Sequence, residues 1–242
     1  MVKKLIGGAV VMLTAFAMFA SGAEAVVSYN LDYVFSGNNP NSSSSWGTIS
    51  FENNGTDTVK VTMTGSLENS SEFFSKWGFS TSESVAGLSF GAITVNSGTV
   101  TGATISSCTQ ANPANCSNNP FKFDGDGYYQ IVVGFQTSAG TGQFTGTESI
   151  SFNITGTGLV EGDFSPGSVG GENGSYHTSA HIQGITGTSS CSAFVGDSTG
   201  TQGGGTSGAC PGSSVPEPGS LALLGGSGLI GLSLAALRFR RR

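Results

Sequence analysis

An acidic, glycine-rich turn is the best candidate for binding an ion in this chain of 242 residues. Asp124 and Asp126 alternate with glycines, and two carboxylates on such a turn can supply oxygen ligands to a hard cation. The EF-hand pattern is absent, because its twelfth position, counted from Asp124, is Phe135 rather than glutamate. The turn predicts a structural Ca²⁺ site at Asp124 and Asp126, with an acidic hairpin turn as the alternative.

A second motif, GDSTG at residues 196–200, matches the GxSxG pattern of serine hydrolases. A nucleophile elbow requires a helix after the serine, whereas a run of three glycines at residues 203–205 follows Ser198. Both histidines of the chain precede this serine, which is the wrong order for an α/β-hydrolase. We therefore interpret the motif as a glycine-rich turn and predict no catalytic residue.

The two histidines, His177 and His181, are four residues apart. On a helix this spacing would place both on one face, where they could hold one metal ion. The surrounding residues are typical of a strand or a loop, along which four residues span about 13 Å. We expect hydrogen-bonded or surface histidines and no zinc site.

Aromatic side chains could form a platform for a sugar ring, and Trp46, Trp77 and Tyr128 are the candidates. Their places in alternating strand patterns favour packing in the core. A pair of acids for glycoside hydrolysis cannot be singled out from the sequence.

The elements that must position these residues are strands. Glycine is abundant, with 39 residues, and helix-favouring residues are scarce in the middle of the chain. Apolar and polar residues alternate with period two over residues 29–35, 46–51, 58–64, 129–135 and 149–155, and shorter candidates cover 74–79, 88–95, 100–105, 180–185 and 193–195. The pattern predicts an all-β fold, a single β-sandwich or jelly-roll-like domain over residues 26–195.

The N-terminus has the three parts of a secretory signal peptide. Lys3 and Lys4 precede an apolar stretch over residues 5–20, and Ala23 and Ala25 form a small-x-small cleavage site. We expect signal peptidase to remove residues 1–25 after export by the Sec route. Residues 196–214 are rich in Gly, Ser and Thr and predict a flexible spacer.

Four cysteines lie in the part that is predicted to be exported, namely Cys108, Cys116, Cys191 and Cys210. An oxidising compartment favours two disulfides. Of the three possible pairings, we predict Cys108–Cys116 and Cys191–Cys210, because each pair encloses a short polar loop. Closing loops of this size stabilises a fold by about 2–3 kcal/mol each.

The last 28 residues, 215–242, have three parts in a fixed order. Pro216, Glu217 and Pro218 form an extended motif, because each proline fixes its own φ and disfavours helix before it. An uncharged, mostly apolar stretch follows and is long enough for a single transmembrane helix. Four arginines end the chain and hold that end in the cytoplasm.

This ending resembles the PEP-CTERM sorting signal of Gram-negative bacteria, with an ordinary tail anchor as the alternative. The resemblance implies that exosortase, a membrane-embedded transpeptidase with a cysteine nucleophile, reads Pro216, Glu217 and Pro218. The motifs at residues 46–51, 58–63, 73–79, 121–127 and 180–185 also resemble a recurrent domain of secreted PEP-CTERM proteins, for which no biochemical role is defined.

These features predict a non-enzymatic, structural protein that is anchored transiently in the inner membrane, processed by exosortase and placed at the cell surface or in the extracellular matrix. Its partners would be signal peptidase, exosortase and the exopolysaccharide of a biofilm. The alternatives are a carbohydrate-binding module, assisted by Ca²⁺, and an extracellular hydrolase. Nucleic acid is excluded as a partner, because residues 26–215 hold three lysines and 13 acids, a net charge of −10.

Overall fold

The computed structural model describes residues 25–40, 44–116, 119–138, 140–172, 174–185 and 191–202. These residues form an all-β fold, as the sequence predicted, and the helices among them are short 3-10 turns. The turns are η1 (Val85–Gly87), η2 (Pro113–Asn115), η3 (Asn119–Phe121) and η4 (Glu161–Phe164).

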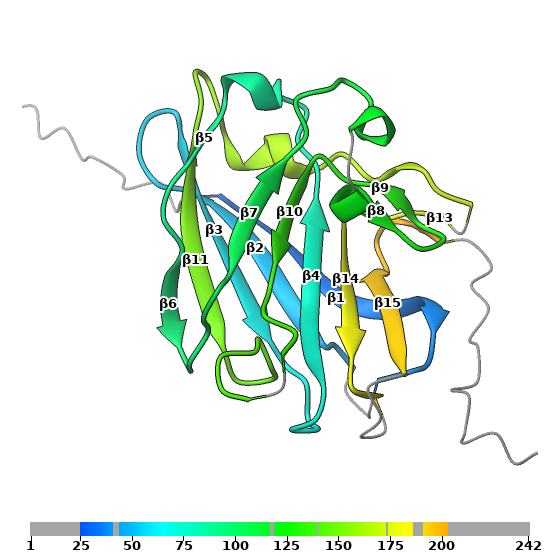
Figure 1. Cartoon of the computed structure of the whole chain (residues 1–242). Coiled ribbons are helices and arrows are strands. Elements are labelled where there is room, and N and C mark those ends of the chain that lie inside the picture. Colours follow the sequence, from blue (N-terminus) through cyan, green and yellow to red (C-terminus); the bar gives the residue numbers. More distant parts are fainter. Residues whose placement is uncertain are drawn as a thin grey trace, which may run out of the picture.

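One antiparallel sheet of 11 strands makes up most of the fold. Its first half holds β5 (Ser89–Phe90), β6 (Thr94–Ser97), β11 (Ser149–Thr155), β3 (Thr58–Gly65) and β2 (Gly47–Asn53). Its second half holds β15 (Ser192–Asp197), β14 (Thr178–Gln183), β4 (Phe73–Phe79), β10 (Ile131–Gly134) and β7 (Thr104–Ser107). Figure 1 shows the two halves as two facing layers.

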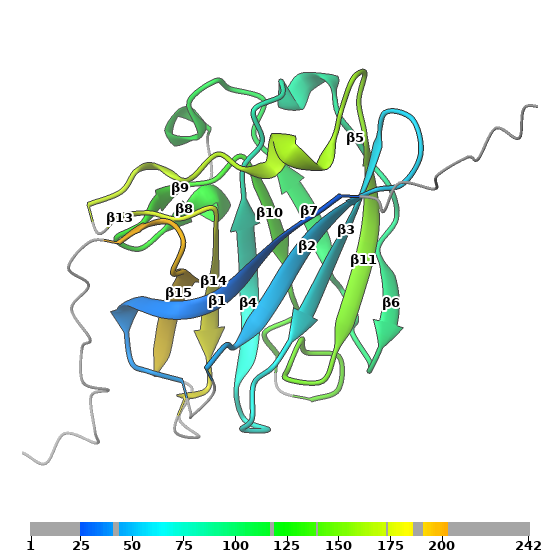
Figure 2. The ribbon, with the colours of Figure 1, turned by 180° about the vertical axis from the view of Figure 1, so that it is seen from behind.

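Strand β1 (Val26–Gly37) joins the two halves. Its residues 26–30 pair with β2, and its residues 31–37 pair with β15. The pairing with β15 shifts register twice, and such irregularities increase the local twist of a strand. β1 therefore runs obliquely from one layer to the other (Figure 2). The two sheets expected for a sandwich are thus two halves of one nearly closed sheet.

The main core lies between the two halves. Residues of alternating positions point inward, because side chains in a strand alternate between its faces. The fully buried residues include Ile49 and Phe51 of β2, Val61 and Met63 of β3, Trp77 and Phe79 of β4, Ile131 and Val133 of β10, and Ile150 and Ile154 of β11. A hairpin connects β2 to β3, and Gly55 in its turn has a φ of 98°.

A second, smaller core covers the outer face of β10. Val132 points away from the main core and is still only 2% exposed. It packs in a cluster with Phe35, Phe121, Phe123, Tyr129 and Tyr176. The alternation over residues 129–135 predicted Tyr129 on the same face as Ile131, and this was wrong. Tyr129 precedes β10 and belongs to the outer cluster.

Short strands complete the fold above this second core. β8 (Lys122–Phe123), β9 (Gly127–Tyr128) and β12 (Val169–Gly170) form a three-stranded sheet, and β13 (Gly174–Ser175) pairs with β16 (Thr201–Gln202). The sequence predicted the end of the domain at residue 195. β15 ends at Asp197, and β16 lies within the segment predicted to be a spacer.

Candidate functional site

The acidic turn forms the tip of a hairpin between β8 and β9. Gly125 and Gly127 adopt φ values of 82° and 114°, a region that favours glycine. β9 also pairs with β12, and the chains are so close that a Cβ on Gly171 would lie 1.7 Å from the carbonyl oxygen of Asp126. The glycines thus allow the hairpin to lie directly against the segment around β12.

The carboxylate of Asp126 points into the protein and is fully buried. Its Oδ1 accepts a hydrogen bond from the hydroxyl of Ser168, and its Oδ2 accepts from the hydroxyls of Tyr129 and Ser179. Burial raises the pKa of Asp126 to about 6, and these hydrogen bonds oppose the rise. The network connects the hairpin, the segment before β12 and strand β14.

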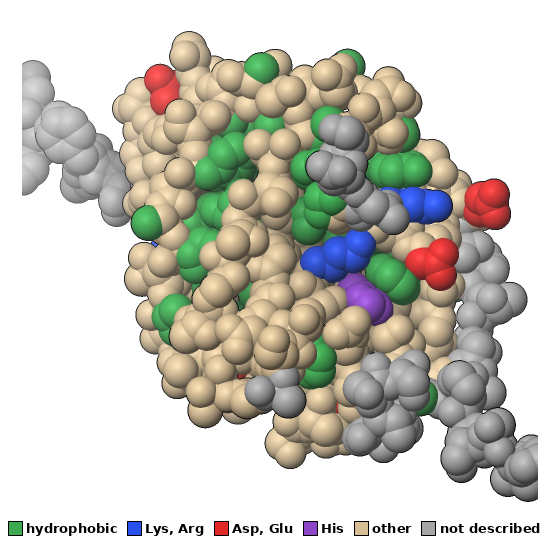
Figure 3. Space-filling view, viewed as in Figure 1, with side chains coloured by type: hydrophobic (Ala, Val, Ile, Leu, Met, Phe, Trp, Pro, Cys, Tyr) green, Lys and Arg blue, Asp and Glu red, His purple; other side chains and the backbone are tan. Residues whose placement is uncertain are grey.

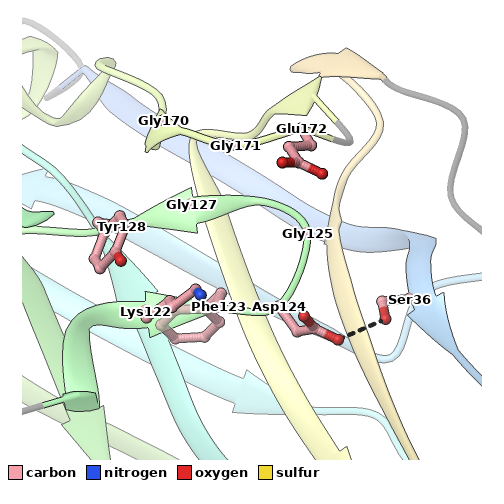
Figure 4. A pocket seen from close by; sticks show the side chains of 10 residues that line it. All are labelled: Ser36, Lys122, Phe123, Asp124, Gly125, Gly127, Tyr128, Gly170, Gly171 and Glu172. Carbon is pink, nitrogen blue, oxygen red and sulfur yellow. Dashed lines mark hydrogen bonds between the residues drawn. The ribbon is translucent and has the colours of Figure 1, made fainter.

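The carboxylate of Asp124 is exposed and accepts a hydrogen bond from Ser36 Oγ at 3.2 Å. It lines an open polar pocket of about 410 Å³ between the hairpin and residues 170–172. Figure 4 shows Glu172 above Asp124 in this pocket and Tyr128 at the opposite end. The other lining residues are Ser36, Lys122, Phe123 and the four glycines 125, 127, 170 and 171.

The two aspartates predicted to share one Ca²⁺ ion therefore lie in different surroundings. Asp124 faces the pocket, whereas Asp126 accepts hydrogen bonds from three protein hydroxyls in the interior. The acid that shares the pocket with Asp124 is Glu172. Among the described residues there is no group of three or more His, Cys, Asp or Glu side chains suited to a metal ion.

A basic and aromatic strip borders the hairpin on the outer face of the sheet (Figure 3). Lys76, His181 and Phe194 are cross-strand neighbours on β4, β14 and β15. The His181 ring stacks on Phe194 with centroids 4.2 Å apart, and the Lys76 ammonium lies 4.3 Å from the centroid of Phe123. Burial lowers the pKa of Lys76 to about 8.

His181 is held in its neutral form. Burial, with help from the positive charge of Lys76, lowers its pKa to about 4, while Asp124 opposes the shift. Its Nδ1 lies 2.7 Å from Ser75 Oγ. His181 thus acts as a packed, hydrogen-bonded side chain, as the sequence predicted.

His177 lies beside Asp197 of the GDSTG motif. Its Nδ1 is 2.9 Å from the buried Asp197 Oδ2, and its ring stacks on Tyr29 at 4.6 Å. Ser198 instead hydrogen-bonds Asp32 through both its backbone N–H and its hydroxyl, at 2.7 and 2.8 Å. Residues 198–199 form a turn after β15, which agrees with our interpretation of this motif.

The two tryptophans do not form a surface platform. Trp77 is fully buried and Trp46 is 5% exposed, and both belong to the main core. The Trp77 indole N–H donates to Thr178 Oγ1 at 2.7 Å. The third aromatic candidate, Tyr128, is partly exposed and lines the hairpin pocket.

A disulfide joins Cys108 and Cys116, whose Cα atoms are 5.9 Å apart. This is the first of the two predicted local pairs. Cys108 is buried in the second core, so the disulfide ties the loop containing η2 to that cluster. Cys191 is also disulfide-bonded, and its predicted partner, Cys210, lies outside the described residues.

The predicted sorting elements lie mostly outside the described residues. They include Ala23 of the signal peptidase site, the motif Pro216, Glu217 and Pro218, and the apolar stretch that follows. Ala25 is described, and β1 begins at the next residue. None of the helices in the described part of the chain is long and apolar enough to cross a membrane.

The described residues thus define an all-β protein with one nearly closed antiparallel sheet and a polar hairpin pocket. No protein-family model matches the chain, and searches of curated proteins and of solved structures gave no significant match.

Sequence reasoning missed most of the pocket. Glu172 and Ser168 carry no local pattern, because they meet the hairpin only through the pairing of β9 with β12. The signals that were present are two neighbouring glycines: Gly171 permits the close approach to the carbonyl oxygen of Asp126, and Gly170 adopts a φ of 79°.

Proposed function

We propose that this chain is an exported protein that exosortase processes and that then becomes part of the cell surface or extracellular matrix. In this proposal the β domain is a structural unit without enzymatic activity. The observation that carries it is the ordered C-terminal sequence: the motif Pro216, Glu217 and Pro218, an apolar stretch and four terminal arginines.

Two features of the described fold support this proposal. The disulfide between Cys108 and Cys116 suits an oxidising compartment outside the cytoplasm. The exposed positions of the strands carry mainly Ser, Thr and Asn. The charges of residues 26–215 are mostly acidic, with 13 acids and three lysines, which suits a soluble extracellular surface.

Replacing Glu217 tests the proposed sorting. In a host that carries exosortase, E217A should accumulate in the inner-membrane fraction, whereas the unchanged protein reaches the surface or the medium. The matched control is E68A, because Glu68 is an exposed acid of the β domain and should not affect sorting. Circular dichroism of E217A should match the unchanged protein, since Glu217 lies outside the described fold. Release of E217A as efficiently as E68A would contradict the proposal.

A carbohydrate-binding module is a second candidate, which the hairpin pocket favours. The pocket combines a partly exposed aromatic residue, Tyr128, with charged side chains and four glycines. Its volume of about 410 Å³ lies within the range of about 300–1,000 Å³ of small-molecule sites. Binding to a matrix polysaccharide would fit the location proposed above.

A further inference from the structure

We propose that the hairpin pocket binds a polysaccharide unit with a free amine, that is, an amino sugar that is not acetylated. This inference depends on the carbohydrate-binding candidate and specifies its ligand. The feature that points to it is the placement of two exposed carboxylates, Asp124 and Glu172, across the pocket from Tyr128 (Figure 4).

The two carboxylates are available for a ligand. Glu172 has no hydrogen bond or ion pair with any described residue, and its side chain is exposed. Among the described residues, the Asp124 carboxylate has one donor, the hydroxyl of Ser36. An ionised carboxylate can accept several hydrogen bonds, so both groups retain acceptor capacity toward an ammonium. A charged donor is the partner that such acceptors hold most strongly.

The charge of the pocket selects against acidic sugars. Lys122 is the single cation among the lining residues, against the two carboxylates. The exported region as a whole is also acidic, with 13 acids and three lysines in residues 26–215. A uronic acid or a sulfated sugar would be repelled, whereas a protonated amine would be attracted both at long range and in the pocket.

The opposite end of the pocket suits a sugar ring better than a peptide. The Tyr128 ring offers an apolar face and a hydroxyl on a side chain with few rotatable bonds, which is a good surface for a flat ligand with polar edges. The backbone of Tyr128 pairs with Lys122 on one strand and with Val169 on the other. This pairing on both sides fixes the position from which the Tyr128 ring projects.

A buried contact between Asp126 and Ser168 pre-organises the two walls of the pocket. Ser168 Oγ binds the Asp126 carboxylate and lies 3.0 Å from the Asp126 carbonyl oxygen. Asp126 is in the hairpin, and Ser168 immediately precedes β12, so this contact fixes the two walls relative to each other. Asp126 is thus a positioning residue, and little conformational entropy is lost when a ligand binds between walls that are already fixed.

The test measures binding to the full-length protein, exported and extracted in a mild detergent. The probes are a short oligomer of β-1,4-linked glucosamine and its fully N-acetylated counterpart, titrated calorimetrically below the pKa of the glucosamine amine. We expect the glucosamine oligomer to bind at least about fivefold more tightly, because acetylation removes the charge that pairs with Asp124 and Glu172. The preference should persist in excess EDTA.

Matched variants test which side chains are responsible. E172Q and D124N should each reduce the preference for the free amine by about twofold, and E68Q should leave it unchanged. Y128A should bind both oligomers more weakly, whereas Y128F should bind them like the unchanged protein. These positions are exposed or partly exposed, so circular dichroism spectra should stay the same for all variants.

The outcomes separate three failures. Equal affinity for the two oligomers, or a preference that survives both E172Q and D124N, would overturn the assignment of an amino sugar. Equally tight binding of a lysine-rich peptide would also overturn the assignment, because it would show a peptide site. Loss of binding in EDTA would overturn it by showing that a cation mediates the contact. Binding of neither oligomer would remove the carbohydrate-binding candidate itself, while the proposed sorting would still stand on the E217A experiment.

Discussion

The hydroxyl of Ser168 lies within hydrogen-bond distance of both the carboxylate and the carbonyl oxygen of Asp126, although the two residues are 42 positions apart. Ser168 is itself buried, with 8% of its surface exposed. This contact joins the hairpin of β8 and β9 to the segment that leads into β12. Its removal would leave a buried carboxylate oxygen without this donor.

We therefore expect S168A to destabilise the fold by about 1–3 kcal/mol, because an unsatisfied buried acceptor loses its hydrogen bond without regaining water. Urea unfolding of S168A against the unchanged protein measures the effect. S165A is the matched control, since Ser165 is exposed and bonds only the nearby carbonyl of Gly162 among the described contacts. Equal midpoints for S168A and S165A would show that the contact does not stabilise the hairpin.

The stability should depend on pH through two buried groups that oppose each other. The pKa of Asp126 is raised from 3.8 to about 6, so its stabilising contribution is complete below pH 3.8 and is lost as the pH rises through about 6. The pKa of His181 is lowered from 6.5 to about 4, so its contribution is complete above pH 6.5 and is lost as the pH falls through about 4. Each effect amounts to about 3 kcal/mol.

Single variants should separate these two effects. Between pH 4 and pH 7, the stability of D126N relative to the unchanged protein should rise with pH, because the ionisation penalty of Asp126 is gone. The relative stability of H181Q should fall with pH over the same range, because the penalty for protonating His181 is gone. Unfolding curves at several pH values measure both slopes. Parallel pH profiles for both variants and the unchanged protein would contradict the assignment.

The Cys108–Cys116 disulfide closes a loop with a sequence separation of eight residues. In the chain-entropy model, such a loop stabilises the fold by about 2–3 kcal/mol. The free energy of unfolding of the double variant C108A/C116A, measured with denaturant, should be lower than that of the unchanged protein by about this amount. A variant as stable as the unchanged oxidised protein would show that the cross-link does not constrain the unfolded chain.

The second disulfide can be identified by non-reducing peptide mapping. Cys191 is disulfide-bonded, and the chain has four cysteines, two of which form the Cys108–Cys116 pair. We expect a peptide that links Cys191 to Cys210 within one chain. A link between Cys191 residues of two copies, or a free Cys210, would contradict this pairing.

The sequence predicted those parts of the fold that local alternation determines. Strands β2, β3 and β11 have the expected inward faces, because their apolar residues alternate with polar ones and are the buried set. The path of β1 could not be predicted in this way. It changes partner from β2 to β15 in mid-strand, and that change depends on a segment more than 150 residues away in the sequence.

The direction of the Asp126 side chain could not be predicted from the sequence either. Its Ser168 and Ser179 partners are 42 and 53 positions away, and no local pattern distinguishes a carboxylate that faces solvent from one that meets buried hydroxyls. The sequence therefore indicated an acidic turn and predicted that both aspartates bind the same Ca²⁺ ion. The structure places Asp124 in the pocket with Glu172 and Asp126 beneath it.

The most direct test of the central claim is the intact mass of the protein released from cells that carry exosortase. Processing at the motif of residues 216–218 predicts a chain that begins at Val26 and lacks residues 221–242, including the four terminal arginines. Mass spectrometry of the non-reduced and reduced protein would show both ends in one measurement. Released molecules that all extend to Arg242 would contradict the proposed sorting.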